Sequence, residues 1–227
     1  YASEDEAVRD VLRLSRGMTY KAAMAGLPYG GGKSVIIGDP RKDKSDALLR
    51  AMGRFVQSLG GRYHTAEDVG TTVDDMDILR KETPYAHGFS SASGDPSPAT
   101  AYGVYRGIQA AVYFATGKTD LGGLTIAVQG LGNVGDRLCR YLADDGVTLV
   151  VADIKEDAVD HAVRAYGATP VAADAIHRAK ADVFAPCALG AILNDTTIPE
   201  LGAEIVAGAA NNQLARHEHG ARLRERG

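Results

Sequence analysis

The residues with the clearest chemistry form a glycine-rich turn at positions 130–135, with the pattern G-x-G-x-x-G. The turn follows an apolar run typical of a strand and leads into a helical pattern. In such a turn the first glycine permits a tight bend, the second lets the backbone approach a pyrophosphate, and the third lets the helix pack closely on the strand. Free N–H groups at the helix N-terminus favour phosphate groups. The sequence therefore predicts a dinucleotide site here, made of Gly130, Leu131, Gly132, Asn133, Val134 and Gly135.

Asp153 adds a second component to this site. It ends the next predicted strand and follows Gly135 by eighteen residues, where a carboxylate accepts hydrogen bonds from the ribose hydroxyls. The same negative charge repels a 2′-phosphate, so the sequence favours NAD over NADP. The alternative is a glycine-rich turn that binds nothing. The strand, turn, helix and carboxylate together favour the NAD site.

A second glycine cluster, Gly30-Gly31-Gly32, precedes Lys33. The phosphate loop of nucleotide hydrolases, G-x-x-x-x-G-K-[ST], fits poorly here. Its first glycine would fall at Leu27, and a β-like run at 34–37 follows where a helix should begin. Three glycines instead let the chain pass close to a ligand, with Lys33 projecting into the cleft. Desolvation and neighbouring cations lower the pKa of a lysine in such a place. The alternative is a solvated surface lysine.

Lys21 and Asp68 are candidate site residues, but their spacing in the sequence does not decide whether they have a functional role. Lys21 lies near the end of the first predicted helix, where a solvated charge is the simpler interpretation. Asp68 follows a predicted short strand at 62–65, and a turn or N-cap aspartate is equally consistent with that place.

The first half of the chain must position Lys21, Lys33 and Asp68. Ser3 and Glu6 have capping-box spacing and begin a helix. Further helices are predicted at 45–59, 73–81 and 99–116. The Ser-, Gly- and Pro-rich stretch 90–98 is the candidate hinge.

The second half alternates strands with helices. Strands are predicted at 125–129, 148–152, 182–185 and 205–207, and helical segments at 134–145, 156–166, 173–178 and 195–201. This alternation predicts a parallel sheet covered on both faces. We therefore expect an α/β protein with a Rossmann-type parallel-sheet domain at 98–227, which binds NAD, and a partial α/β substrate and oligomerisation domain at 1–97.

The overall composition and charge argue against several classes of binding partner. The 227 residues carry a net charge of −4 and no basic run, which argues against a nucleic-acid partner. Cys139 and Cys187 lack zinc-ligand spacing, and no metal site is expected. No apolar run reaches the roughly 18 residues of a membrane span, and the polar, acidic N-terminus is no signal peptide. We expect a soluble, cytoplasmic protein without a membrane partner.

Several segments occur together in a specific order: 18–21 (MTYK), 30–33 (GGGK), 65–72 (TAEDVGTT), 211–214 (NNQL) and the glycine-rich turn. Through them almost the whole chain resembles the Glu/Leu/Phe/Val dehydrogenase family, and within it most closely the leucine dehydrogenases and their valine and phenylalanine relatives. The resemblance implies a reversible oxidative deamination, in which an L-amino acid, water and NAD⁺ give a 2-oxo acid, ammonium and NADH.

The resemblance also implies roles for matching residues. Lys33 is then the catalytic lysine that activates the attacking water, and Asp68 exchanges protons with the substrate amine. Lys21 pairs with the substrate carboxylate, and Asn212 holds that carboxylate or the nicotinamide side. Ala66 lines the side-chain pocket. The further cofactor contacts implied are Thr100, Cys187, Ala188, Leu189 and Asn211, with Cys187 a small buried residue rather than a nucleophile.

Family members carry an additional N-terminal segment and continue past residue 227 with a further strand and helix, so we expect this chain to be truncated at both ends. Ala66 suits an apolar substrate side chain. One methylene changes discrimination by only about 1–3 kcal/mol, so leucine, isoleucine, valine and phenylalanine stay open. A catalytically incomplete NAD-binding fragment is the main alternative. A non-enzymatic NAD sensor is weaker, because Lys21, Lys33 and Asp68 are all retained. The family implies a homo-oligomer.

Overall fold

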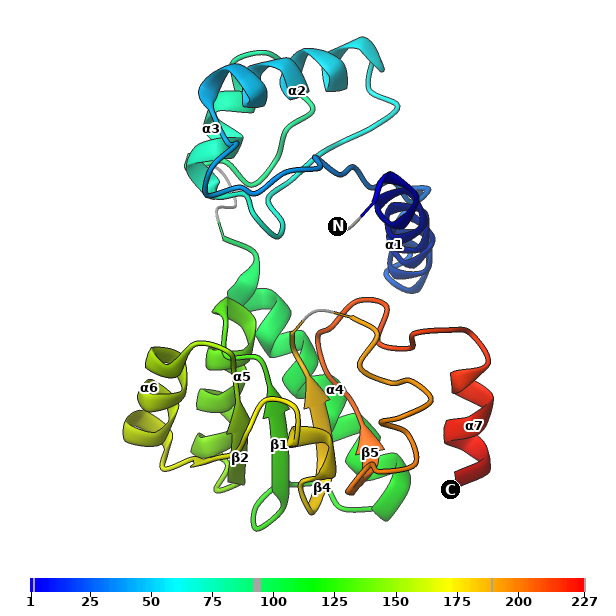
Figure 1. The fold of residues 1–227 in the computed structure, drawn as a ribbon, viewed down its shortest axis with the longest axis vertical. Coiled ribbons are helices and arrows are strands. Elements are labelled where there is room, and N and C mark those ends of the chain that lie inside the picture. Colours follow the sequence, from blue (N-terminus) through cyan, green and yellow to red (C-terminus); the bar gives the residue numbers. More distant parts are fainter. Residues whose placement is uncertain (2, 92–94, 189, 227) are drawn as a thin grey trace. The chain divides into compact units, whose positions relative to one another are not determined.

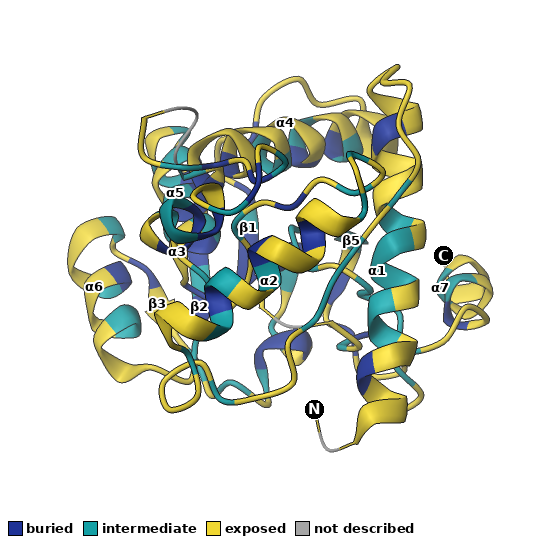
Figure 2. Ribbon diagram, turned by 90° about the horizontal axis from the view of Figure 1, so that it is seen from above, coloured by how far each residue is buried: buried dark blue, intermediate teal, exposed yellow. Residues whose placement is uncertain are grey.

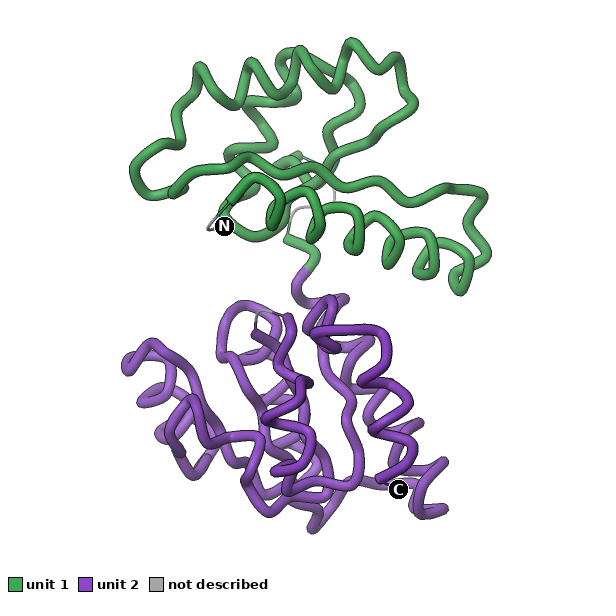
Figure 3. The backbone as a smooth tube through the Cα atoms, turned by 45° about the vertical axis from the view of Figure 1, so that its right-hand side comes forward, with its two compact units in different colours: residues 1–96 green, residues 97–227 purple. Residues whose placement is uncertain are grey.

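The computed structural model describes residues 1, 3–91, 95–188 and 190–226. The chain divides into two compact units, Tyr1–Pro96 and Ser97–Gly227, which Figure 3 colours separately. Each unit has its own cluster of buried apolar side chains. The functional roles of the two predicted domains, at 1–97 and 98–227, stay predictions.

Three helices dominate the first unit: α1 (Glu4–Met24), α2 (Asp46–Ser58) and α3 (Val73–Arg80). Each begins at a side-chain cap, because a hydroxyl oxygen satisfies a free N–H group of the first turn. Ser3 Oγ accepts from the N–H of Glu6, 3.2 Å away, and Ser45 Oγ accepts from Leu48. Thr72 forms a reciprocal capping box with Asp75. The three helices expected from the sequence in this region are confirmed.

Helices α2 and α3 pack together in the first unit. Their buried cluster consists of Leu49, Met76, Leu79 and Ala86. Gly53 allows the close approach, because a Cβ atom there would lie 2.8 Å from Cβ of Glu82 and 3.0 Å from the Leu79 carbonyl oxygen. Figure 2 shows the buried positions of α2 as dark patches on a helix that is otherwise largely exposed.

Two predicted strands of the first unit are wrong. Residues 34–37 and 62–65 form no strand; the second segment contributes only an isolated parallel bridge between Thr65 and Ala86. In this bridge the Thr65 N–H donates to the Tyr85 carbonyl at 2.9 Å, and the His87 N–H donates to the Thr65 carbonyl at 2.8 Å. A β-like composition makes a strand only where a neighbouring strand completes the ladder, and the described residues offer none to 34–37.

The second unit contains one parallel sheet of five strands. These are β1 (Thr125–Gln129), β2 (Thr148–Ala152), β3 (Thr169–Pro170), β4 (Ala181–Pro186) and β5 (Ala203–Val206), in the order β3-β2-β1-β4-β5. Figure 1 labels β2, β1, β4 and β5, which lie side by side in that order. Four of them were predicted. Strand β3 was not, because only two residues pair with β2 and one of these is a proline.

Helices α4 (Ser97–Thr116), α5 (Asn133–Asp144) and α6 (Glu156–Tyr166) match their predicted segments to within two residues. Helix α4 begins inside the candidate hinge 90–98, of which 92–94 lie outside the described residues. Within the described part of the chain, no helix is both long and apolar enough to cross a membrane.

Two predicted helices of the second unit are wrong, and one helix was not predicted. Residues 173–178 contain only the short 3₁₀ helix η1 (Ile176–Arg178), and the predicted helix at 195–201 is replaced by turns over 195–200. Asn194 Oδ1 accepts from the N–H groups of Thr196 and Thr197, at 2.9 and 3.0 Å, which favours a turn. The strongly polar helix α7 (His219–Arg226) has too few apolar residues to reveal its periodicity in the sequence.

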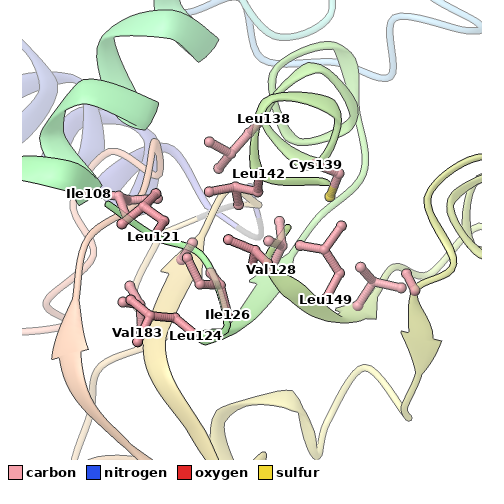
Figure 4. Close-up of a cluster of buried hydrophobic side chains, with 14 of the residues drawn as sticks. Ile108, Leu121, Leu124, Ile126, Val128, Leu138, Cys139, Leu142, Leu149 and Val183 are labelled. Atoms are coloured by element: carbon pink, nitrogen blue, oxygen red, sulfur yellow. The ribbon is translucent and has the colours of Figure 1, made fainter. Parts of the chain in front are cut away.

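Successive residues of β1 point to opposite faces of the sheet. Ile126 and Val128 lie in the cluster that α4, α5 and α6 cover, whereas Ala127 packs in a second cluster with Phe184 and Ile176. Figure 4 shows the first cluster, with labels on Ile108, Leu121, Leu124, Ile126, Val128, Leu138, Cys139, Leu142, Leu149 and Val183. The sheet is thus covered on both faces, and the predicted α/β, Rossmann-type fold class is confirmed.

Candidate functional site

The carboxyl ends of the parallel strands carry the glycine-rich turn. Gly130 has φ of +90°, a left-handed conformation that favours glycine, and its N–H donates to the Ala152 carbonyl at 2.8 Å. A Cβ atom on Gly130 would lie 2.8–3.0 Å from atoms of Ala188. The turn after β1 and the loop after β4 therefore touch at a point where only glycine fits.

The other two glycines play different parts. A Cβ atom on Gly135 would collide with the Gly130 carbonyl, so this glycine lets the start of α5 pack directly on the turn. A Cβ atom on Gly132 would have no atom within 4 Å among the described residues. Gly132 is the N-cap of α5, and no side-chain hydrogen bond caps that helix. Open space over Gly132 and an uncapped N-terminus beginning at Asn133 and Val134 fit a phosphate group.

Asp153 is joined to this turn directly. Its Oδ2 accepts from the N–H of Leu131 at 2.6 Å, and its Oδ1 accepts from the N–H of Lys155 at 2.9 Å. The side chain is half-buried at the end of β2. A carboxylate has about four acceptor positions, so two remain for ribose hydroxyls. The residues present thus fit a dinucleotide.

Two loops interlock beyond β4 and β5. The Ala191 N–H donates to the Asn212 carbonyl at 2.8 Å, and the Leu193 N–H donates to Gln213 at 2.9 Å. Ala191 and Asn212 both have left-handed backbones, with φ of +64° and +48°. Such non-glycine residues are uncommon and cluster at functional sites. A Cβ atom on Gly190 would lie 2.8 Å from the Asn212 carbonyl oxygen and 2.5 Å from that of Asn211.

The remaining predicted cofactor residues of this unit are placed as follows. The Cys187 N–H donates to the Gln129 carbonyl at 2.7 Å, which fixes the start of the loop that contains Ala188. Burial raises the pKa of the Cys187 thiol to about 11, so it is no nucleophile near neutrality. Thr100 lies in the first turn of α4 and is exposed. Leu189 lies outside the described residues.

In the first unit, the structure brings Lys33 and Asp68 together. Lys33 Nζ forms an ion pair with Asp68 Oδ2, although the two residues are 35 positions apart. The Lys33 side chain is 23% exposed and the Asp68 side chain 43%. This is a partly desolvated cation and carboxylate within proton-transfer reach of each other.

The Asp68 loop is fixed by its own hydrogen bonds. The N–H of Asp68 donates to Thr71 Oγ1 at 2.9 Å, and this hydroxyl donates to the Asp68 carbonyl at 2.8 Å. The Val69 N–H donates to Asp68 Oδ1 at 2.8 Å. The carboxylate therefore has one oxygen held by its own loop and the other at Lys33.

The segment just before Lys33 packs on helix α1. A Cβ atom on Gly31 would collide with the Ser15 carbonyl and with Thr19, so the glycine segment lies directly on the helix backbone. Burial and the positive charge of Lys21 lower the pKa of Lys33, and the charge of Asp10 acts in the opposite direction. The ion pair with Asp68 also favours the ammonium form. Lys21 lies in the last turn of α1 and is exposed.

Asp68 is preceded in the sequence by Ala66, which is exposed, and by half-buried Glu67, which was not among the predicted site residues. Within the described structure, Glu67 Oε2 is buried and has no hydrogen-bond partner. Burial and the charges of Asp95 and Asp75 raise the pKa of this carboxyl. Glu67 and Asp68 are adjacent acidic residues, and no pattern in the sequence distinguishes a role for Glu67 from that of Asp68.

Comparisons with known proteins show what the chain is similar to. Residues 1–85 match the family described as Glu/Leu/Phe/Val dehydrogenase, dimerisation domain. The whole chain is 58% identical to leucine dehydrogenase of Thermoactinomyces intermedius and 57% identical to that of Geobacillus stearothermophilus. It spans 63% of the length of each. The crystal structure of L-tryptophan dehydrogenase from Nostoc punctiforme matches with a TM-score of 0.77 and 49% identity, over 100% of this chain and 66% of that one. The chain belongs to the Glu/Leu/Phe/Val dehydrogenase family.

Proposed function

We propose that the protein containing this chain is an NAD-dependent dehydrogenase of branched-chain apolar L-amino acids. In this reaction the amino acid, water and NAD⁺ give the 2-oxo acid, ammonium, NADH and a proton. The observation that carries the proposal is the ion pair between Lys33 and Asp68, in a segment that packs on α1 through Gly31 and within the electrostatic influence of Lys21.

The chemistry assigned to these residues follows from their protonation. With its pKa lowered, Lys33 releases a proton more readily than a solvated lysine, so it serves as the base that activates water and then stabilises the negative oxygen that forms. Asp68 lies within contact of Lys33 and exchanges the proton of the substrate amine. Exposed Lys21 offers its ammonium group to the substrate carboxylate.

The second unit supplies the cofactor side of the proposal. Bound NAD accepts the hydride from the substrate carbon. The N-terminus of α5 would hold the pyrophosphate, and Asp153 would hold the ribose hydroxyls and discriminate against a 2′-phosphate. Asn212 would orient the substrate carboxylate or the nicotinamide side. The further proposed cofactor contacts are Thr100, Cys187, Ala188, Leu189 and Asn211.

The substrate class rests on the names of the relatives and on Ala66. Two relatives at 57–58% identity are leucine dehydrogenases, and a small exposed residue beside Asp68 leaves room for an apolar side chain. Phenylalanine is the alternative substrate. The description of the matching family as a dimerisation domain supports a homo-oligomer.

Because this chain spans 63% of its relatives, a second candidate applies to residues 1–227 alone: an NAD-binding fragment without turnover. Two measurements separate the candidates. NADH formation at 340 nm is followed at alkaline pH with L-leucine, L-valine, L-isoleucine and L-phenylalanine, for the full-length protein and for residues 1–227. NAD binding is measured by calorimetry for both. Absence of turnover with all four substrates in the full-length protein would refute the dehydrogenase. Binding without turnover in residues 1–227 alone would support the fragment.

A further inference from the structure

Tyr63 contacts the chain on both sides of Lys33. Its ring lies against Gly32, where a Cβ atom would be only 2.8 Å from the ring atoms Cδ2 and Cε2. Its hydroxyl lies 2.9 Å from Ser34 Oγ, in hydrogen-bond distance. The tyrosine is half-buried, and so are Lys33 and Ser34. One side chain thus fixes the residues immediately before and after the lysine.

The other end of this connection is the Asp68 segment. Tyr63 precedes Thr65 by two residues, and Thr65 is anchored to the first unit by its backbone bridge to Ala86. Asp68 follows in the loop held by Thr71. The backbone that carries Asp68 therefore also carries the side chain that holds Lys33.

The Lys33 segment needs such a contact. Residues 34–37 pair with no strand in the described structure, so no backbone ladder fixes the segment after the lysine. Gly31 on α1 fixes it from one side. Tyr63 adds a second contact, from the segment that leads to Asp68.

We propose that Tyr63 is a positioning residue that holds Lys33 against Asp68 and shields it from water. The consequence for turnover rests on the proposed dehydrogenase function, whereas the effect on Lys33 itself does not. Without the ring, water reaches Lys33 more freely, so the desolvation free energy that disfavours its charged ammonium form becomes smaller. The pKa of Lys33 then moves back toward that of an ordinary lysine.

The test is the chemical reactivity of Lys33 across pH, measured in the full-length protein by competitive acetylation and peptide mass spectrometry. Exposed Lys81 and Lys118 are internal references. Tyr63→Ala is expected to raise the pH midpoint of Lys33 labelling by about half a unit or more, given the size of desolvation effects, and to leave the references unchanged. Tyr85→Ala is the matched control, because that ring lies on His64 and Gly61 instead. An unchanged Lys33 midpoint in folded Tyr63→Ala would overturn the proposal.

Smaller variants keep the test decisive if Tyr63→Ala does not fold. Tyr63→Phe and Ser34→Ala each remove one partner of the same hydrogen bond. Both are expected to change the Lys33 labelling rate at least twofold and in the same direction, with Tyr85→Phe unchanged. Rates equal to wild type in both variants would refute the role. If the Tyr63 variants change Lys33 labelling as expected but the wild-type protein shows no turnover, the dehydrogenase proposal fails and the Tyr63 proposal stands.

Discussion

The N–H of Leu131 donates to Asp153 Oδ2 at 2.6 Å, which ties the glycine-rich turn after β1 to the end of β2. Leu131 is buried, so this hydrogen bond satisfies a backbone group that has little access to water. The carboxylate expected to select the cofactor therefore also holds the turn in shape. Changes at Asp153 should affect stability as well as cofactor choice.

Asp153→Ser and Asp153→Asn separate these two roles. Both remove the negative charge, so both are expected to weaken the preference for NAD over NADP, measured as the ratio of dissociation constants. Serine cannot reach both N–H groups, and an unsatisfied buried donor costs about 1–3 kcal/mol. Asparagine keeps one acceptor oxygen and should lose less stability in a denaturant titration. An unchanged NAD preference in both variants would count against the assigned role.

Gly132 and Gly135 form a matched pair for testing the phosphate site. Gly135→Ala places a methyl group on the Gly130 carbonyl, so it should destabilise the second unit by about 1–3 kcal/mol, as overpacking does. Gly132→Ala meets no atom within 4 Å in the described structure. It should therefore fold normally and still weaken NAD binding, because the methyl group occupies the proposed pyrophosphate position. Calorimetry and thermal melting of both variants check this; tight NAD binding by Gly132→Ala would contradict the site.

The β1–turn–α5–β2 unit could be predicted because its pattern lies in one continuous stretch of sequence. Apolar strands, the glycine pattern and a helix follow one another directly there. Prediction from the sequence failed at 34–37, where strand formation depends on a distant partner, and at 195–201, where the side chain of Asn194 stabilises turns.

The candidate site was less visible in the sequence. Spacing left the roles of Lys21 and Asp68 open, and only the family resemblance singled them out. The contact of Asp68 with Lys33, 35 positions away, has no local sequence pattern. The hydrogen bond between Leu131 and Asp153 and the two contacts of Tyr63 depend on how segments pack. They required the structure.

Replacing Lys33 tests the proposed chemistry directly. Lys33→Ala in the full-length protein should lower kcat by about 10²–10⁴-fold, the usual contribution of a general acid or base. NAD affinity should change little, because the cofactor contacts proposed here lie in the second unit. Steady-state kinetics and calorimetry measure the two effects. A variant with near-normal kcat would exclude Lys33 as the catalytic base.

The pH dependence of activity supplies a sharper test, because the charges of Lys21 and Asp10 shift the pKa of Lys33 in opposite directions. Lys33 has a lowered pKa, so its neutral, basic form becomes populated below the ordinary lysine value of 10.5. As a base it should make kcat/KM rise with pH through that lowered pKa.

The charge of Lys21 lowers this pKa and that of Asp10 raises it. Lys21→Met should therefore move the rising limb to higher pH, and Asp10→Asn should move it to lower pH. Because Lys21 is also the proposed carboxylate site, its variant should raise KM as well, whereas Asp10→Asn should not. Limbs that shift in the same direction, or that stay at the wild-type pH in both variants, would show that the rising limb does not report Lys33.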